Sequence, residues 1–241
     1  MRRLLLAAGM WAAAGAALAQ PAHPGMSAQA MAEHRMTFSM VRAEVDQGRG
    51  DGADLTTWDA EAWIGGDMNK LWVTSVGERA DGKTEHAEVQ ALYSRNVASF
   101  WDLQAGVRHD FEPGEANYLV LGVKGLAPYR FETDAHLFLS DEGRLGARLK
   151  QKLDLRFTQR LVLEPEITLD AQAQDAPEQG LGAGLTSFEA ALRLRYEITR
   201  KFAPYVKLAY GRKLGETAGL ARAAGEDPEA SALSAGLRFW F

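Results

Sequence analysis

The sequence predicts an all-β protein, an antiparallel transmembrane β-barrel of about 12 strands with a short N-terminal tail. The first observation is that segments of roughly 10 to 14 residues alternate apolar and polar side chains with a period of two, as strands do. The second is that no later segment approaches the roughly 18 consecutive apolar residues of a membrane-spanning helix. The third is that long and short connections alternate along the chain, which is typical of outer-membrane barrels.

Residues 1–19 predict a secretory signal peptide. The chain begins MRR, stays apolar over residues 4–16 and reaches ALA at 17–19, the three regions of such a signal. Its removal takes away two arginines and no acid, which moves the formal net charge from −5 to −7. This balance argues against a nucleic-acid partner. The chain has no cysteine, so disulfides and thiolate metal sites are excluded.

Residues 20–35 predict a short tail, because prolines, alanines and polar residues follow one another without a sustained period. From residue 36 to 241 the alternating pattern predicts the barrel. Its strands are expected at approximately 36–46, 54–65, 69–78, 84–97, 100–112, 117–126, 129–140, 143–157, 160–174, 184–199, 202–213 and 230–241.

The connections predict the orientation of the barrel. Those after even-numbered strands are tight, whereas longer polar loops are expected at 47–54, 78–84, 175–184 and 214–230. This arrangement is typical of a barrel in the outer membrane of a Gram-negative bacterium, with both termini on the periplasmic side. The last strand ends on Phe241, and other aromatic residues near strand ends fit interfacial girdles.

The polar face of the strands distinguishes lipid outside from solvent outside. A secreted soluble barrel or sandwich would alternate equally well. However, segments 143–157 and 160–174 carry runs of full charges opposite Leu-rich faces, which favours outer-membrane lipid around a charged lumen. A basic row there faces Glu164, Glu166 and Asp170. This ladder fixes register and fills the lumen, or it serves conduction; a lumen of twelve strands should be narrow.

Methionine and histidine predict copper binding by the tail. The methionines after the signal segment are at 26, 31, 36, 40 and 68, and a core would have spread them over all strands. Thioether and imidazole are suitable donors for Cu(I) or Cu(II) where thiols are absent. The alternative is that these methionines are neutral tail residues or pack at the barrel mouth. The candidate tail ligands are His23, Met26, Met31, His34, Met36 and Met40.

A weaker metal site is expected inside the lumen. His136 shares a strand face with Glu132 and Asp134, so Asp134 and His136 are candidate ligands, although such residues often form hydrogen bonds across strands. His86 shares a face with Glu88, whereas His109 should point outward near a rim. No hydrolytic or nucleotide-binding motif stands in a suitable context, so we expect no enzymatic activity. A rim hydrolase that uses His109 is the remote alternative.

Seven collinear blocks resemble the copper-resistance protein B family of bacterial outer-membrane proteins. The resembling blocks are WDAEAWIGGDMNKLW at 58–72, YSRNVASFWDLQAGVRHDF at 93–111, GLAPYRFETDAHLFL at 125–139, FTQRLVLEPE at 157–166, RLRYEITRKFAPYV at 193–206, ARAAGED at 221–227 and GLRFWF at 236–241. The resemblance implies copper binding, copper tolerance and cooperation with a periplasmic multicopper oxidase. The expected function is capture of periplasmic copper, followed by export or sequestration; the alternative is a generic narrow porin or structural barrel.

Overall fold

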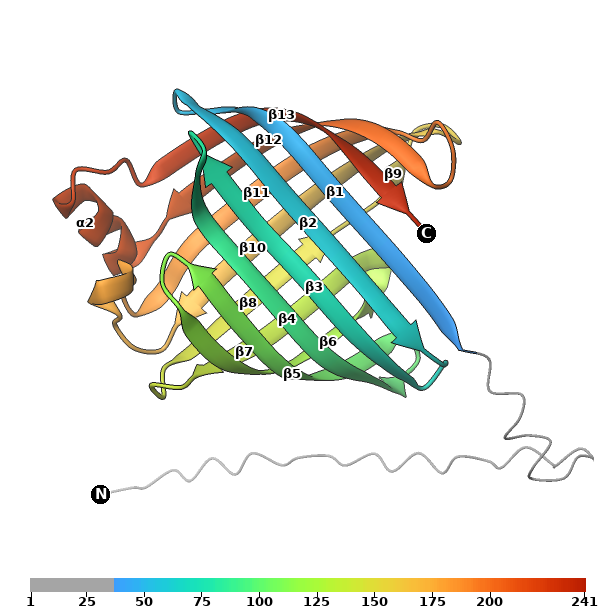
Figure 1. Ribbon diagram of the computed structural model, residues 1–241, viewed down its shortest axis with the longest axis horizontal. Helices are drawn as coiled ribbons and strands as arrows, with labels where there is room; N and C mark the ends of the chain where they lie inside the picture. The colour runs from blue at the N-terminus through green and yellow to red at the C-terminus, as the bar shows by residue number, and fades with distance from the viewer. Residues whose placement is uncertain (1–36) are drawn as a thin grey trace, which may run out of the picture. The chain divides into compact units, whose positions relative to one another are not determined.

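The structure is a computed structural model that describes residues 37–241. Within this part of the chain, twelve antiparallel strands form one sheet that closes on itself through the pairing of β10 with β11, and a two-residue strand, β9, adds to one edge of β10. The predicted all-β barrel of about 12 strands is therefore confirmed (Figure 1). The predicted signal peptide and tail lie outside the described residues.

The strand bounds follow the period-two segments closely. They are β1 (Phe38–Gly50), β2 (Ala53–Gly65), β3 (Asn69–Ala80), β4 (Lys83–Ala98), β5 (Trp101–Glu112), β6 (Ala116–Ala127), β7 (Phe131–Ser140), β8 (Leu145–Lys152), β9 (Leu155–Arg156), β10 (Leu161–Gln172), β11 (Gly184–Tyr196), β12 (Phe202–Lys213) and β13 (Glu229–Trp240). Neighbours in the chain are neighbours in the sheet, and β13 pairs with β1. The helical elements are η1 (Pro128–Arg130), η2 (Pro177–Gln179) and α2 (Gly215–Ala223).

The barrel has two different rims. We call the rim at which β1 begins and β13 ends the termini rim; its turns span 66–68, 99–100, 128–130, 157–160 and 197–201. The opposite rim is the loop rim, and its two long connections span 173–183 and 214–228. In Figure 1, α2 marks the loop rim at the left, and the C-terminus marks the termini rim at the right.

Two expected loops on the loop rim are shorter than predicted. Strands continue through most of 47–54 and 78–84, leaving Asp51-Gly52 and Asp81-Gly82 as two-residue turns. All four turn residues have positive φ, from 48° to 88°. Asp-Gly suits a type I′ turn, which matches the twist of the strands that it joins. Turn chemistry therefore extended the strands beyond the point where the apolar alternation fades.

The single strand expected at 143–157 is interrupted. β8 ends at Lys152, which pairs with Glu166, and pairing resumes only where Leu155 meets Leu163. The break lies opposite Pro165 of β10, whose carbonyl accepts a hydrogen bond from the N–H of Leu153 at 3.1 Å. Because proline has no N–H, β10 cannot return a ladder bond at this position, and the partner strand divides.

Helix α2 lies in the long connection for which only an irregular polar loop was expected. Ala218 and Ala221 are buried, and the hydroxyl of Thr217 accepts a hydrogen bond from the N–H of Gly182 at 2.9 Å. The alanine-rich segment therefore forms a helix because small residues let it pack against the other long loop. Among residues 37–241, no helix is long and apolar enough to cross a bilayer.

The outer face of the barrel is apolar and the inner face is charged. Large outward side chains such as Leu119, Val206 and Leu233 are more than half exposed, whereas Glu164, Arg195 and Arg238 are buried inside. A continuous apolar surface of this extent is unusual for a soluble monomer. The predicted sorting of charges onto one strand face is confirmed.

Candidate functional site

The lumen contains the charged side chains that the alternating pattern directs inward, and they form three networks. The first, the arginine cluster, lies toward the termini rim and consists of Arg193, Arg195, Arg238, Glu44 and Glu164. Arg238 bridges both carboxylates, at 2.5 Å to Glu44 and 2.9 Å to Glu164. Arg193 contacts Glu44 at 3.2 Å and also pairs with Glu164. Arg195 completes the set by pairing with Glu164.

This arginine cluster is withdrawn from water, since Glu164, Arg195 and Arg238 are no more than 2% exposed. Burying one ion costs several kcal/mol, and only close pairing and hydrogen bonding offset that cost. The strands that carry the cluster are β1, β10, β11 and β13, which lie on one wall of the barrel. The cluster therefore fixes four strands to one another from inside.

The second network crosses the middle of the lumen. Lys150 of β8 contacts Glu166 of the neighbouring β10 at 3.1 Å and Asp59 of β2 at 3.7 Å. Lys124 of β6 lies 3.5 Å from Glu61 of β2 and 3.3 Å from Asp134 of β7. The contacts with Asp59 and Glu61 link strands that are not neighbours in the sheet. We call the contact between Lys150 and Asp59 the central bridge.

The third network lies toward the loop rim and centres on Glu88. Arg148 of β8 contacts Glu88 of β4 at 3.2 Å, although β5, β6 and β7 lie between these two strands in the sheet. Arg108 of β5 contacts Glu88 at 2.8 Å. Each arginine also holds a second carboxylate: Arg148 contacts Asp170 at 2.8 Å and Arg108 contacts Asp110 at 2.5 Å. The carboxylates of this network are therefore occupied by guanidinium groups.

An apolar wall completes the lumen, formed by the inward side chains of Trp72, Leu92, Val120 and Phe138. Met40, the second inward residue of β1 from the termini rim, packs against this wall. The Lys124 ammonium lies 4.7 Å from the ring centroid of Trp72, within range of a cation–π interaction. Indole and ammonium groups thus meet on this wall, and Met40 packs against it.

These contacts determine what the lumen can do with a cation. A cation that travels along the axis meets carboxylates that already hold lysine or arginine, and the central bridge lies across its path. Glu189 of β11 is an inward residue that remains more than a third exposed, so the lumen is not completely filled around it. Ion pairs therefore cross the lumen, but side chains do not fill it completely.

Most predicted copper ligands lie outside the described residues, namely His23, Met26, Met31, His34 and Met36. Met40 is described, and it lies inside the barrel mouth rather than in a free tail. The placement leaves its thioether half-buried against aromatic rings. The alternative that methionine packs at the barrel mouth therefore applies to Met40.

The two predicted lumen ligands have other partners. The carboxylate of Asp134 accepts a hydrogen bond from Lys124, and a ring nitrogen of His136 lies 2.9 Å from the amide oxygen of Gln104. Glu132, the third member of that strand face, contacts Lys152 at 2.9 Å. Among residues 37–241, no three His, Asp or Glu side chains come together in a geometry that could hold a metal ion. Lys124 donates to Oδ2 of Asp134, whereas Oδ1 of the same carboxylate is buried and has no hydrogen-bond partner among the described residues.

The other histidines lie where strand parity puts them. His86 is inward, 3.4 Å from Glu88, and His109 is near the loop rim, where its Nδ1 lies 2.8 Å from Asn117. Parity also predicts that the basic row of segment 143–157 faces Glu164, Glu166 and Asp170. Lys150 contacts Glu166 and Arg148 contacts Asp170, whereas Glu164 pairs instead with Arg193, Arg195 and Arg238 of β11 and β13. The cross-lumen contacts of Lys150 and Lys124 were not predicted, because strand parity gives no information about which residues meet across a closed barrel.

The sequence is similar to those of known proteins. The family model described as Copper resistance protein B precursor (CopB) matches residues 35–241. A protein of Escherichia coli named Copper resistance protein B is 37% identical over 217 residues, which cover 90% of this chain and 73% of that protein. A Copper resistance protein B homolog of Pseudomonas syringae pv. tomato is 44% identical over 196 residues, 81% of this chain and 66% of the relative.

A solved porin structure has a similar fold. The NanC porin superposes with a TM-score of 0.57 and 14% sequence identity, over 82% of this chain and 98% of the porin. At this identity the likeness concerns the fold alone.

Proposed function

Because the chain belongs to the copper resistance protein B family and so has a role in copper resistance, we propose that it binds copper through the tail and the adjoining barrel mouth and holds it there. Copper is the cargo of this protein and not a catalytic cofactor, and the protein acts without catalysis. The observation that best supports this proposal is the position of Met40. It belongs to the methionine-rich segment of the sequence, and its thioether faces the lumen at the termini rim.

The chemistry of the donors supports Cu(I) as the preferred form of the cargo. Thioether sulfur is a soft donor that favours Cu(I), and imidazole accepts Cu(I) or Cu(II). His23, Met26, Met31, His34 and Met36 precede the barrel in the sequence. Beyond Met40, the inward residues of β1 are Arg42, Glu44 and Asp46, which are held in ion pairs. Along β1, the last thioether donor is therefore Met40, and the ion-paired residues begin at Arg42.

The bridged lumen favours retention over free passage. A copper ion bound at Met40 would have to pass the ion pairs of Lys124 and Lys150 to cross the lumen. The two ammonium groups repel the copper ion, and the carboxylates that could attract it are already paired with them. Retention at the mouth lowers the concentration of free copper without an open path through the membrane.

Copper tolerance of cells tests this proposal. The variant M26L/M31L/M36L/M40L removes four thioethers and keeps the side chains apolar and similar in volume. We expect cells that carry it to lose most of the tolerance that the wild type gives. Met68→Leu is the matched control, since Met68 lies in a turn of the termini rim and is 53% exposed. Full tolerance of the quadruple variant would contradict the proposal.

Export through the lumen is the second candidate, favoured by the solvent-exposed Glu189 inside the barrel. In this case Asp134 and His136 are transfer ligands, and the unpaired Oδ1 of Asp134 is the first donor. Copper flux into proteoliposomes separates the candidates: retention predicts no flux above protein-free vesicles, whereas export predicts flux that Asp134→Asn and His136→Ala reduce.

The proposed location is the outer membrane of a Gram-negative bacterium, surrounded by lipid, with both termini on the periplasmic side. The exposed apolar belt of the barrel supports a bilayer around it. A protease added to intact cells should leave an epitope fused after Phe241 intact and should cut one inserted at Gly219 of α2. Cleavage of only the epitope after Phe241 would show that the barrel has the opposite orientation.

A periplasmic multicopper oxidase is the proposed partner, as the family resemblance implies. We expect the oxidase to co-purify with the wild type. We expect it not to co-purify with a variant that lacks residues 20–35. If the oxidase co-purifies equally with both forms, the tail is not its binding segment.

A further inference from the structure

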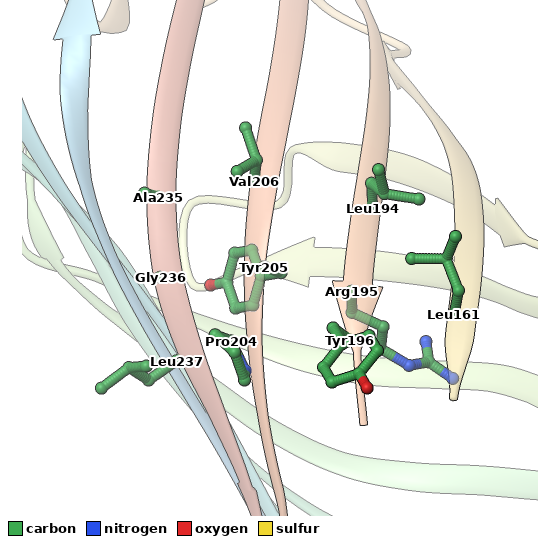
Figure 2. A pocket seen from close by; sticks show the side chains of 10 residues that line it. All are labelled: Leu161, Leu194, Arg195, Tyr196, Pro204, Tyr205, Val206, Ala235, Gly236 and Leu237. Atoms are coloured by element: carbon green, nitrogen blue, oxygen red, sulfur yellow. The ribbon is translucent and has the colours of Figure 1, made fainter. Parts of the chain in front are cut away.

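A groove lies on the outer face of the barrel, across β10 to β13 near the termini rim. It has a volume of about 540 Å³ and an almost wholly apolar lining. Figure 2 shows the side chains of Leu194 and Val206 extending from their strands, while Ala235 between Val206 and Leu237 carries only a methyl group. The groove exists because β12 and β13 present Pro204 and Ala235 where neighbouring outward positions carry Leu, Val or Tyr.

Three cations lie at the end of this groove. Arg160 directly precedes Leu161, and Arg200 and Lys201 lie in the turn that follows Tyr196; Leu161 and Tyr196 both line the groove. The two turns touch, because the N–H of Glu197 donates to the carbonyl of Arg160 at 2.8 Å. Lys201 lies next to β13, since its carbonyl accepts from the N–H of Trp240 at 2.9 Å.

The nearby acids do not neutralise these cations. Asp154 pairs with the buried Arg195 at 2.5 Å, and Glu197 pairs with Arg156 at 3.3 Å. Arg160, Arg200 and Lys201 are all exposed, and within residues 37–241 none of them has a carboxylate partner. An apolar groove therefore ends in a local excess of three positive charges.

We propose that this groove binds an anionic phospholipid of the leaflet at the termini rim, with an acyl chain between Leu194 and Val206 and the phosphate against Arg160, Arg200 and Lys201. The inference rests on the proposed membrane location and is independent of copper. Arginine pairs with phosphate oxygens in a bidentate manner, and lysine adds a point charge. The exposed ring of Tyr196 suits the level of the headgroups.

The size of the effect follows from the number of cations. Each basic residue beside an anionic lipid surface raises affinity about fivefold. Three such residues give a preference for phosphatidylglycerol over phosphatidylcholine on the order of tenfold to a hundredfold, reduced by salt. An apolar groove without the cations would accept an acyl chain from any phospholipid and show no such preference.

Native mass spectrometry of the full chain tests the proposal, with lipid retention measured after release from mixed phosphatidylglycerol and phosphatidylcholine nanodiscs. The wild type should retain phosphatidylglycerol. R160A/R200A/K201A should lose the preference, and R95A/R130A/R222A, which removes three exposed cations elsewhere, should keep it. Ala235→Phe fills the groove without altering charge and should reduce retention of both lipids. Heat-modifiable mobility confirms that each variant is a folded barrel.

Equal retention of both lipids by the wild type would overturn the proposal, as would an unchanged preference in R160A/R200A/K201A. Preferential retention of lipid A in a three-lipid mixture would also overturn the assignment to a phospholipid. Copper is absent throughout, so the result does not depend on the copper-binding proposal, and loss of copper binding would leave this prediction intact.

Discussion

Lys150 lies 3.7 Å from Asp59, and these two residues belong to strands on opposite sides of the barrel. In the closed ring of twelve strands, β2 and β8 are six places apart in either direction. The same ammonium contacts Glu166 at 3.1 Å on the neighbouring strand. One lysine thus spans the lumen, and the barrel is narrow enough for a single side chain to reach across it.

Lys150→Ala is expected to raise the single-channel conductance of the barrel severalfold and to make it cation-selective. The substitution shortens the side chain that crosses the lumen and leaves Asp59 and Glu166 without their shared cation. Planar bilayer recordings measure both properties. Lys213→Ala, at the exposed end of β12, is the control that should leave conductance unchanged. If Lys150→Ala conducts no better than the wild type, the central bridge does not limit passage.

Glu164→Gln should destabilise the barrel by about 3 to 5 kcal/mol, because it removes a buried carboxylate that three arginines share. Urea unfolding in detergent micelles, followed by heat-modifiable mobility, measures the loss. Glu115→Gln, in an exposed turn, makes the same chemical change and should alter the free energy of unfolding by less than about 0.5 kcal/mol. Similar stability in both variants would show that the arginine cluster is not a structural clamp.

Gly106→Ala should also destabilise the fold, by about 1 to 3 kcal/mol. A Cβ at this inward position would lie 2.0 Å from the carbonyl oxygen of Ala91 and 2.8 Å from the Cα of Leu92, so backbone must shift. Gly114→Ala is the matched substitution, since a Cβ there meets nothing within 4 Å. Thermal unfolding of the two variants should differ clearly. Equal transition temperatures would indicate that strands β4 and β5 separate at little cost.

The strands could be predicted from the sequence because each has a charged face and an apolar face. In β10, Glu164 and Glu166 alternate with Leu163 and Ile167, and this contrast fixes which side faces the lumen. Strand ends were harder to predict. Asp51-Gly52 forms a tight turn within a polar stretch, and Pro165 divides the partner strand, and both effects depend on hydrogen bonds between strands that polarity does not encode.

The candidate site was only partly predictable. Strand parity predicts that Asp134 and His136 face the lumen, but their partners Lys124 and Gln104 come from other strands. The contact of Lys150 with Asp59 depends on the number of strands and on their stagger around the closed barrel, which together decide which positions meet. Helix α2 forms because a second loop provides a packing surface, and the local sequence alone carries no sign of that loop.

The central claim is that thioethers at the N-terminal side of the barrel hold the cargo. Its most direct test is competitive Cu(I) titration of the purified full chain in detergent. The account predicts that M26L/M31L/M36L/M40L binds far more weakly than the wild type, while Met68→Leu binds as the wild type does. Equal Cu(I) affinity of the wild type and the quadruple variant would contradict it.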